Sequence, residues 1–271
     1  MPKTWSPLEE KERKDELIEL YIHQNKTISK IAPILRITPS TVYDRLIRFQ
    51  IPTRRNEKPG ANNARILHVP PLSEDLAEFC GVMLGDGHIG TAQIFITVNI
   101  KTDWQYVGYL QDLLERLFQF TPRATNANHE SVVDLYLTSA YLVGRLHEIG
   151  LYSSNKVRDQ VGVPEWIFGA TEYQRGFLRG FFDTDGSIYR LKHFDAVQMS
   201  FSNLSVPLLE GTRRLLLGLG YHPSKFSGHA VYLTRRRDIK NYAQEIGFGN
   251  LKHLSRATMF GVAGAFKAVM A

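Results

Sequence analysis

The chain has 271 residues, a length that favours two or three compact units over one small domain. Hydrophobic residues make up 43% of it and charged residues 22%, which is ordinary for a globular protein and excludes a disordered or collagen-like chain. The single cysteine, Cys80, excludes an internal disulfide framework and a cysteine zinc cluster. The charged N-terminus and the lack of a long apolar run predict a soluble protein with no membrane partner, located in the cytoplasm or in an organelle.

Basic residues are concentrated near the N-terminus. The formal net charge of the whole chain is +6, and residues 21–60, with eight cationic and two acidic side chains, account for all of it. This density predicts a polyanionic partner, and nucleic acid is favoured over a membrane surface because no broad apolar face accompanies the charge. A solvated basic face is the alternative that charge alone leaves open.

The same region has the pattern of three short helices. Apolar residues predict a helix over 10–24 and a second short helix over 28–35. Residues 36–38 suit a tight turn, and Pro39 is placed to begin a third helix. The segment from 28 to 55 resembles the small helix-turn-helix domains of bacterial regulators and resolvases, so we expect residues 1–57 to form a helix-turn-helix DNA-binding domain.

The third of these helices is the predicted recognition helix. Its residues that face away from the expected core mix hydrogen-bonding groups, which suit base edges, with cations, which suit phosphates. The candidate DNA-binding residues of this region are Ser40, Thr41, Tyr43, Arg45, Arg48, Arg54 and Arg55. A three-helix protein-interaction module is the alternative. Residues 58–72, which begin with Pro, Gly and Asn and lack periodicity, are predicted to be a linker.

Beyond the linker, an apolar segment that ends in Asp-Gly occurs twice. The sequence EFCGVMLGDG at residues 78–87 recurs as FLRGFFDTDG at residues 177–186, so that two aspartates, 99 residues apart, take the same place. The similarity continues downstream of both segments, and a lysine follows in each copy. We therefore expect a duplicated unit, with residues 73–170 as the first repeat and residues 171–271 as the second.

Each copy is predicted to be a helix with glycine in its middle. Gly81 and Gly180 lack the side chain that would hold two helix backbones apart, so the two helices are expected to pair closely. Gly87 and Gly186, which follow the aspartates, are expected to take the left-handed conformation that ends many helices.

Pairing of the helices would bring Asp86 and Asp185 side by side. Two carboxylates at the negative ends of two helix dipoles repel each other unless a cation lies between them, and hard divalent ions such as Mg²⁺ bind carboxylate and water oxygens. A single Asp-Gly after an apolar helix is more often a simple helix stop. The repetition of the acid at the place where two stops would repel favours a metal site.

The two motifs, FCGVMLGDG and LRGFFDTDG, resemble those of a monomeric LAGLIDADG homing endonuclease, and the resemblance covers residues 74–256. The segment LHEIGLYSSNKV and the stretch that leads into the second motif resemble the intein-type branch. The resemblance implies a site-specific endonuclease that hydrolyses phosphodiester bonds of double-stranded DNA at a long asymmetric target. It also implies that the protein acts as a monomer with Mg²⁺, for which Mn²⁺ or Ca²⁺ can substitute in binding.

The resemblance also implies roles for individual residues. The catalytic residues would be Asp86, Asp185, Lys156 and Lys252. The metal ligands would be Asp86, Asp185, Gly85 and Thr184. The first motif has Leu84 where the second has Asp183. We expect Asp183 to be exposed or at the edge of packing, without a catalytic role.

Strand patterns follow each motif. Apolar and polar residues alternate over four segments, at residues 93–100, 133–137, 197–202 and 231–234. Helices are expected at about 103–118 and 205–218. The predicted fold class is α+β, and the family implies an αββαββα order in each of two pseudo-symmetric repeats whose sheets form a saddle on DNA, preceded by the small all-α domain.

The polar faces of these strands supply the candidate base readers, although each could also be plain solvent surface. They are Gln93, Thr97, Asn99, Tyr136, Gln198, Ser200 and Tyr232. Arg235, Arg236 and Arg237 are expected to contact phosphates. Two alternative functions share the resemblance: a WhiA-like DNA-binding transcription regulator that has lost cleavage, and an RNA maturase that binds intron RNA and assists splicing.

Overall fold

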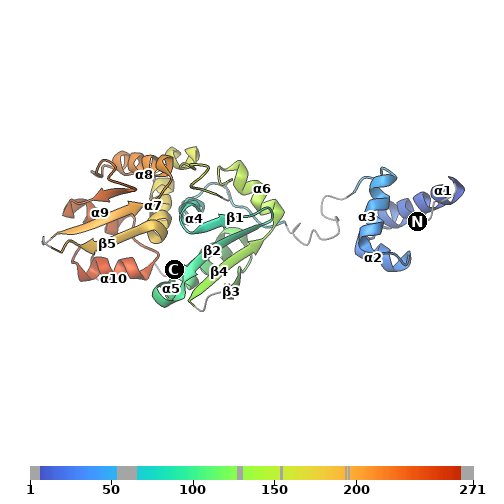
Figure 1. Cartoon of the computed structure of the whole chain (residues 1–271), viewed down its shortest axis with the longest axis horizontal. Helices are drawn as coiled ribbons and strands as arrows, with labels where there is room; N and C mark the ends of the chain where they lie inside the picture. Colours follow the sequence, from blue (N-terminus) through green and yellow to red (C-terminus); the bar gives the residue numbers. More distant parts are fainter. Residues whose placement is uncertain are drawn as a thin grey trace. The chain divides into compact units, whose positions relative to one another are not determined.

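The computed structural model describes residues 7–53, 66–126, 131–152, 155–192, 194 and 196–263 (Figure 1). The chain divides into two compact units, residues 1–65 and residues 66–271. No helix within the described ranges is long and apolar enough to cross a membrane.

The N-terminal unit is built from helices. Its elements are α1 (Pro7–Ile18), the π-helical turn η1 (Glu19–His23), α2 (Ile28–Ile34) and α3 (Pro39–Arg48). They enclose a core that includes Leu17, Tyr21, Ile31, Val42 and Leu46. The expected helical segments and the turn before Pro39 are therefore confirmed, with a π-helical turn at the end of the first one.

The start of α3 has a clear local cause. The Thr38 side chain accepts a hydrogen bond from the Thr41 amide at 3.2 Å, which satisfies one of the unpaired donors of the first turn. Pro39, at the first helical position, has a fixed φ that suits a helix and no amide hydrogen to leave unpaired. Arg36 takes a left-handed φ of 51° in the turn between α2 and α3.

The first repeat of the second unit has the expected αββαββα order. Its elements are α4 (Glu74–Leu84), β1 (Gly87–Ile89), β2 (Gln93–Asn99), α5 (Ile100–Phe118), β3 (Arg123–Asn126), β4 (Val132–Thr138) and α6 (Ala140–Glu148). The four strands form an antiparallel sheet in the order β1-β2-β4-β3.

The second repeat has one strand fewer than expected. Its elements are η2 (Glu165–Gly169), α7 (Thr171–Asp185), β5 (Gly186–Arg190), β6 (Val197–Ser202), α8 (Val206–Gly218), β7 (Ala230–Leu233), α9 (Arg236–Glu245) and α10 (Leu251–Met259). Its sheet has the order β5-β6-β7. The segment that precedes β7 forms no ladder with it: the Ser227–Ala230 bridge and the hydrogen bond from the Ser224 amide to the Tyr232 oxygen at 2.8 Å join the two, and Gly228 between them has a left-handed φ of 60°.

The alternation predicted for the central strands is confirmed with one correction. Ile94, Ile96 and Val98 of β2 are buried, as the period of two required. The expected continuation of the strand to Ile100 is wrong. Asn99 ends the strand, because its side-chain oxygen accepts a hydrogen bond from the Lys101 amide at 3.0 Å and starts α5 at Ile100.

Helices α4 and α7 pack against each other between the two sheets (Figure 1). A Cβ atom on Gly81 would lie 2.6 Å from the backbone nitrogen of Phe181, and one on Gly180 would lie 2.9 Å from the backbone carbon of Glu78. Both contacts are too short for a real side chain. The prediction that these glycines permit a close helix pair is therefore confirmed.

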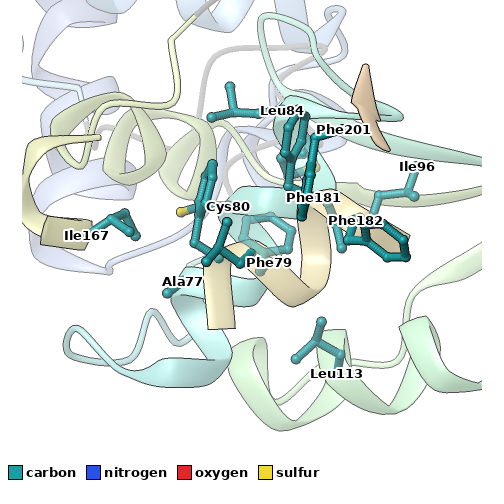
Figure 2. Packing of buried hydrophobic residues seen from close by; sticks show 14 of the residues in the cluster. Ala77, Phe79, Cys80, Leu84, Ile96, Leu113, Ile167, Phe181, Phe182 and Phe201 are labelled. Atoms are coloured by element: carbon teal, nitrogen blue, oxygen red, sulfur yellow. The ribbon is translucent and has the colours of Figure 1, made fainter. Parts of the chain in front are cut away.

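Aromatic side chains fill the space around this pair (Figure 2). Phe79 of α4 meets Phe118 of α5 edge to face, with ring centroids 5.2 Å apart. Phe182 of α7 meets Phe201 of β6 in the same way, at 5.1 Å. Each helix of the pair thus packs against its own repeat with aromatic rings, which fixes the position of both helix ends relative to the sheets.

The conformation predicted for the glycines after the aspartates is wrong. Gly186 is extended, with φ −93° and ψ 160°, and neither it nor Gly87 has a positive φ. Glycine is needed there for space. A Cβ on Gly87 would lie 2.6 Å from the sulfur of Met83, and one on Gly186 would lie 2.6 Å from the ring of Phe182. The chain therefore passes from α7 directly into β5, and from α4 into β1 after two residues.

Candidate functional site

The two repeated aspartates lie at the ends of the paired helices. Asp86 lies two residues after the end of α4, and Asp185 is the last residue of α7. Desolvation raises the pKa of Asp86, although its side chain is still reached by solvent. Burial raises the pKa of Asp185 to about 6, and the negative charge of Asp86 contributes to that shift. The fold thus brings the two carboxylates within electrostatic reach of each other, in surroundings that disfavour their charge.

The side chain of Lys156 is hydrogen-bonded to the backbone at the end of α4. Its ammonium donates hydrogen bonds to the backbone oxygens of Met83, at 3.2 Å, of Gly87, at 2.8 Å, and of Gly85. Burial lowers the pKa of Lys156, and the charges of Asp185 and Asp86 act against that shift. The ammonium therefore neutralises the carbonyl end of the helix and lies close to both aspartates.

Lys252, the counterpart of Lys156 in the second repeat, has a different partner. It lies in the first turn of α10, and its ammonium is 2.8 Å from Oδ1 of Asp103. Its charge lowers the pKa of Asp86, against the larger effect of desolvation. Both predicted lysines are therefore near the aspartates, but they are held there by different groups.

A cavity of about 240 Å³ opens beside Asp86. It extends between the end of β2, the start of α5, the end of α7 and the start of α10. Its polar lining includes Asp86, Thr97, Asn99, Asp103, Asp183, Thr184, Asn250 and Lys252. Three carboxyl groups and one ammonium group thus face one hollow.

The oxygen-rich composition of the site suits a hard divalent cation. Within the described ranges, no group of three or more His, Cys, Asp or Glu side chains is arranged to hold a metal. Two carboxylates are nevertheless sufficient for Mg²⁺, which keeps several water ligands and is often bound through one or two carboxylates plus substrate phosphates. The two further expected metal ligands, Gly85 and Thr184, have partners within the protein. The backbone oxygen of Gly85 accepts a hydrogen bond from Lys156. The hydroxyl of Thr184 donates to the oxygens of Gly180 and Phe181, at 3.2 and 3.1 Å.

The expectation for Asp183 is wrong. Its side chain is buried, with 2% of its surface exposed, and its Oδ2 accepts a hydrogen bond from the Gly249 amide at 2.7 Å. Burial and the nearby negative charge of Glu78 raise the pKa of Asp183 well above its usual value. Asp183 therefore joins α7 to the segment before α10, as a structural link beside the cavity.

An ionic network joins α4 and α7 on the N-terminal side of the two aspartates. Glu78 of α4 is buried, and its Oε2 lies 2.6 Å from Nη2 of Arg179 on α7. Tyr109 of α5 donates a hydrogen bond to Oε1 of the same carboxylate, and Arg179 also donates to Glu74 at 3.0 Å. The buried charges are paired and hydrogen-bonded, so they link the helices in one register.

Three of the candidate readers of the first sheet contact neighbouring side chains on the same sheet. Gln93 donates to Thr138 at 2.7 Å, and Thr97 donates to Asp134 at 2.7 Å. Tyr136 stacks on Phe95, with ring centroids 6.0 Å apart. Thr97 and Asn99 are exposed and Gln93 and Tyr136 are half-buried. These side chains form one ordered polar and aromatic face.

In the second sheet, two of the candidate readers are half-buried and one is buried. Gln198 accepts a hydrogen bond from Tyr189 at 2.7 Å, and both it and Tyr232 are half-buried. Ser200 lies between Ser187 and Tyr232 in the register of the sheet and is only 5% exposed. Ser200 is therefore covered in this structure, and its role as a base reader stays a prediction.

Most of the candidate phosphate contacts that the structure describes are exposed. Arg235, Arg236 and Arg237 are exposed at the start of α9, and Arg236 donates to the backbone oxygens of Phe260 and Gly261, both at 3.3 Å. On α3 and beside it, Ser40 and Arg48 are exposed, while Thr41, Tyr43 and Arg45 are half-buried. Arg54 and Arg55 lie outside the described residues.

Sequence reasoning missed three polar residues beside the aspartates. Asn203 follows β6 and donates to Oδ2 of Asp185 at 2.5 Å. Asp103 and Asn250 meet beside Lys252, with Asn250 Nδ2 donating to Asp103 Oδ1 at 3.0 Å. Each has the appearance in sequence of an ordinary turn or helix-start residue, so the sequence contained no signal that set them apart.

Comparison with known proteins identifies part of this unit. Residues 172–247, which include α7 and the second Asp-Gly motif, match the family described as the LAGLIDADG-like domain. The match is confined to the second repeat and covers less than half of the chain. The α+β class with antiparallel sheets, predicted from the sequence, is confirmed by the described elements.

Curated relatives of the chain share a segment with it and little more. The ribonucleoside-diphosphate reductase NrdEB subunit alpha of Bacillus subtilis is 30% identical in an alignment of 171 residues that covers 57% of this chain and 15% of that protein. The replication factor C small subunit of Thermococcus kodakarensis is 26% identical in an alignment of 210 residues that covers 73% of this chain and 23% of that protein. The chain therefore spans less than a quarter of the length of either relative.

Two solved structures are also similar to the chain. The N-terminal LAGLIDADG domain of DUF199/WhiA has a TM-score of 0.46 and 14% identity, and the match covers 64% of this chain and 81% of that one. A variant of the homing endonuclease I-DmoI has a TM-score of 0.43 and 16% identity, with 64% and 95% covered.

Proposed function

We propose that the chain is a site-specific endonuclease that hydrolyses double-stranded DNA with a divalent metal ion. One observation carries the proposal. Asp86 and Asp185, repeated in sequence, come together at the ends of α4 and α7, with the ammonium of Lys156 close to both. Two carboxylates and a cation, with a cavity open beside Asp86, suit the stabilisation of charge on a phosphodiester.

Asp86 and Asp185 would hold the metal, for which Mg²⁺ is the natural candidate and Mn²⁺ or Ca²⁺ a substitute in binding. The raised pKa values of both carboxyl groups support this assignment, since a bound cation would relieve the cost of their charges. The metal, when bound, supplies Lewis-acid activation of water and of the scissile phosphate. Gly85 and Thr184 are the backbone positions proposed to complete the site.

The two lysines would act as fixed positive charges. Lys156 cannot move without breaking three hydrogen bonds to backbone oxygens, so its ammonium is held in one place near the aspartates. Lys252 faces the cavity, where it can approach a phosphate oxygen. Fixed charges of this kind stabilise developing negative charge without reorganisation during the reaction.

The DNA would lie on the polar faces of the two sheets. Because the faces differ, Gln93, Thr97 and Asn99 on one and Gln198 and Tyr232 on the other, a monomer would read two unlike half-sites. We propose the basic N-terminal unit as a helix-turn-helix domain that adds a separate contact through α3.

The curated relatives support a function of the shared segment that does not depend on the activity of the protein that contains it. One is named for ribonucleotide reduction and another for replication, and this chain matches only a minor part of each. The shared segment therefore need not carry either named activity. A DNA endonuclease domain that is found within unrelated proteins accounts for this distribution.

Incubation of the protein with a library of randomised duplexes and Mg²⁺, followed by sequencing of cut ends, tests the proposal. We expect enrichment of one long asymmetric sequence, cut in both strands, and no cut ends with Asp86→Asn as a matched control. Sequence-selective binding without cutting by the wild-type protein, with either Mg²⁺ or Mn²⁺, would favour the regulator instead. Stimulated splicing of an intron RNA in place of DNA cutting would favour the maturase.

A further inference from the structure

The two lysines beside the aspartates are not equivalent. Lys156 donates to three backbone oxygens at the end of α4. Lys252 instead forms an ion pair with Asp103, with Nζ and Oδ1 2.8 Å apart. The difference breaks the symmetry of the duplicated unit at the place where its two halves meet.

Asp103 is itself held firmly. Its Oδ1 accepts a hydrogen bond from Asn250 at 3.0 Å, its Oδ2 accepts one from Thr102 at 2.6 Å, and only 11% of its side chain is exposed. Its backbone departs from the helical conformation, with φ −133° and ψ 27°, which bends the first turn of α5. Asp103 and Thr102 come from the first repeat, whereas Asn250 and Lys252 come from the second.

The surroundings of the two catalytic carboxylates differ accordingly. Asp185 is hydrogen-bonded by Asn203 at 2.5 Å. Asp86 shares the 240 Å³ cavity with Asp103 and Lys252. One half of the site is thus closed by internal hydrogen bonds, and the other half opens on a hollow in which a single ammonium is held by a carboxylate.

We propose that Asp103 is a positioning residue that holds the Lys252 ammonium in the cavity beside Asp86, and that it serves the cutting of only one of the two DNA strands. This inference rests on the proposed endonuclease function and adds a division of labour to it. A flexible lysine gains a defined position from a rigid carboxylate that is hydrogen-bonded on both of its oxygens. Lys156 has no need of such a partner, because backbone oxygens hold it.

Cleavage of a duplex with differently labelled strands, under single-turnover conditions, tests the proposal. We expect Asp103→Asn to slow the cutting of one strand by ~10- to 100-fold, the range typical of residues that orient a functional group, and to leave the other strand nearly unaffected. Lys252→Met should slow the same strand. The double variant should be no slower than Lys252→Met alone, and Asp103→Glu should restore part of the rate.

Asp112→Asn is the matched control, because Asp112 is an exposed acid on the same helix. It should leave the rates for both strands unchanged. Equal slowing of both strands by Asp103→Asn would overturn the proposal, since loss of structure alone would affect both. Additive effects in the double variant would also overturn it.

A second measurement does not depend on cleavage. The ¹⁵N resonance of the Lys252 ammonium should be sharp and protected from exchange in the wild-type protein and in Asp112→Asn, and should be lost in Asp103→Asn. An unprotected ammonium in the wild-type protein would refute the pairing. Failure of the wild-type protein to cut any duplex while its ammonium remains protected would instead refute the endonuclease function.

Discussion

Gly180 of α7 lies directly against the carbonyl group of Glu78 on α4, where a Cβ atom would come within 2.9 Å of the carbonyl carbon. Gly81 has the reciprocal relationship with α7. The two positions set the distance between the helices, and this distance brings Asp86 and Asp185 together. The spacing of the site is therefore fixed by the absence of two side chains.

Gly81→Ala and Gly180→Ala should each destabilise the protein by about 3 kcal/mol or more, because backbone atoms on the facing helix cannot yield to the added methyl group. Gly108→Ala on α5 is the control, since no atom lies within 4 Å of a Cβ at that position. It should stabilise the protein by roughly 0.5–1 kcal/mol through helix propensity. Urea unfolding measures all three, and equal effects at the three positions would contradict the account.

Lys156→Met and Lys252→Met should both slow cleavage, by ~10²–10³-fold if each lysine stabilises developing charge. Lys156→Met should also reduce stability, by roughly 1–3 kcal/mol, because it leaves three backbone oxygens at the end of α4 without their donor. Lys252→Met should reduce it as well, because it leaves the largely buried Asp103 without its ion-pair partner. Thermal unfolding and single-turnover rates separate the two effects. Unchanged rates in both variants would show that the lysines serve packing alone.

His253 should make the protein sensitive to mild acid. It is 1% exposed between Phe182 and Phe248, and burial lowers its pKa to about 4 from an ordinary value of 6.5. Below pH 6.5 the unfolded chain binds a proton that the folded protein resists, so stability should fall as the pH decreases from 6.5 to 4. The total loss is about 3 kcal/mol.

His253→Phe, which suits the aromatic surroundings, should remove most of that dependence. Urea unfolding at pH 7 and at pH 4.5 measures it. The control is His88→Phe, because His88 is an exposed histidine on β1. An identical loss of stability on acidification in wild type and His253→Phe would assign the effect to other groups.

Much of the fold could be predicted from the sequence, because it is determined by local patterns. Alternation identified β2, and the glycines identified the helix pair. What could not be predicted depends on contacts between distant segments. Asp183 is buried because the amide of Gly249, 66 residues away in sequence, reaches it. Asp103 meets Lys252 across the two repeats, and nothing near either residue indicates its partner.

Removal of residues 1–65 should weaken DNA binding and shorten the footprint on one side of the target while the cut position stays fixed. The N-terminal unit is compact by itself and carries most of the net positive charge of the chain, so it should add affinity through effective concentration. If about four of its cations contact phosphates, the slope of log K against log salt should become shallower by roughly 3 to 4. An unchanged footprint and slope would indicate a partner other than this DNA.

The central claim is that Asp86 and Asp185 form one metal-dependent centre that cuts DNA. Single-turnover cleavage of the selected target, with Mg²⁺, by the wild-type protein and by Asp86→Asn and Asp185→Asn tests it most directly, with DNA affinity measured in parallel in Ca²⁺. The account predicts that each variant loses cleavage while its affinity stays within a few-fold of wild type, because the interface consists mostly of other contacts. Cutting by either variant at close to the wild-type rate would contradict it.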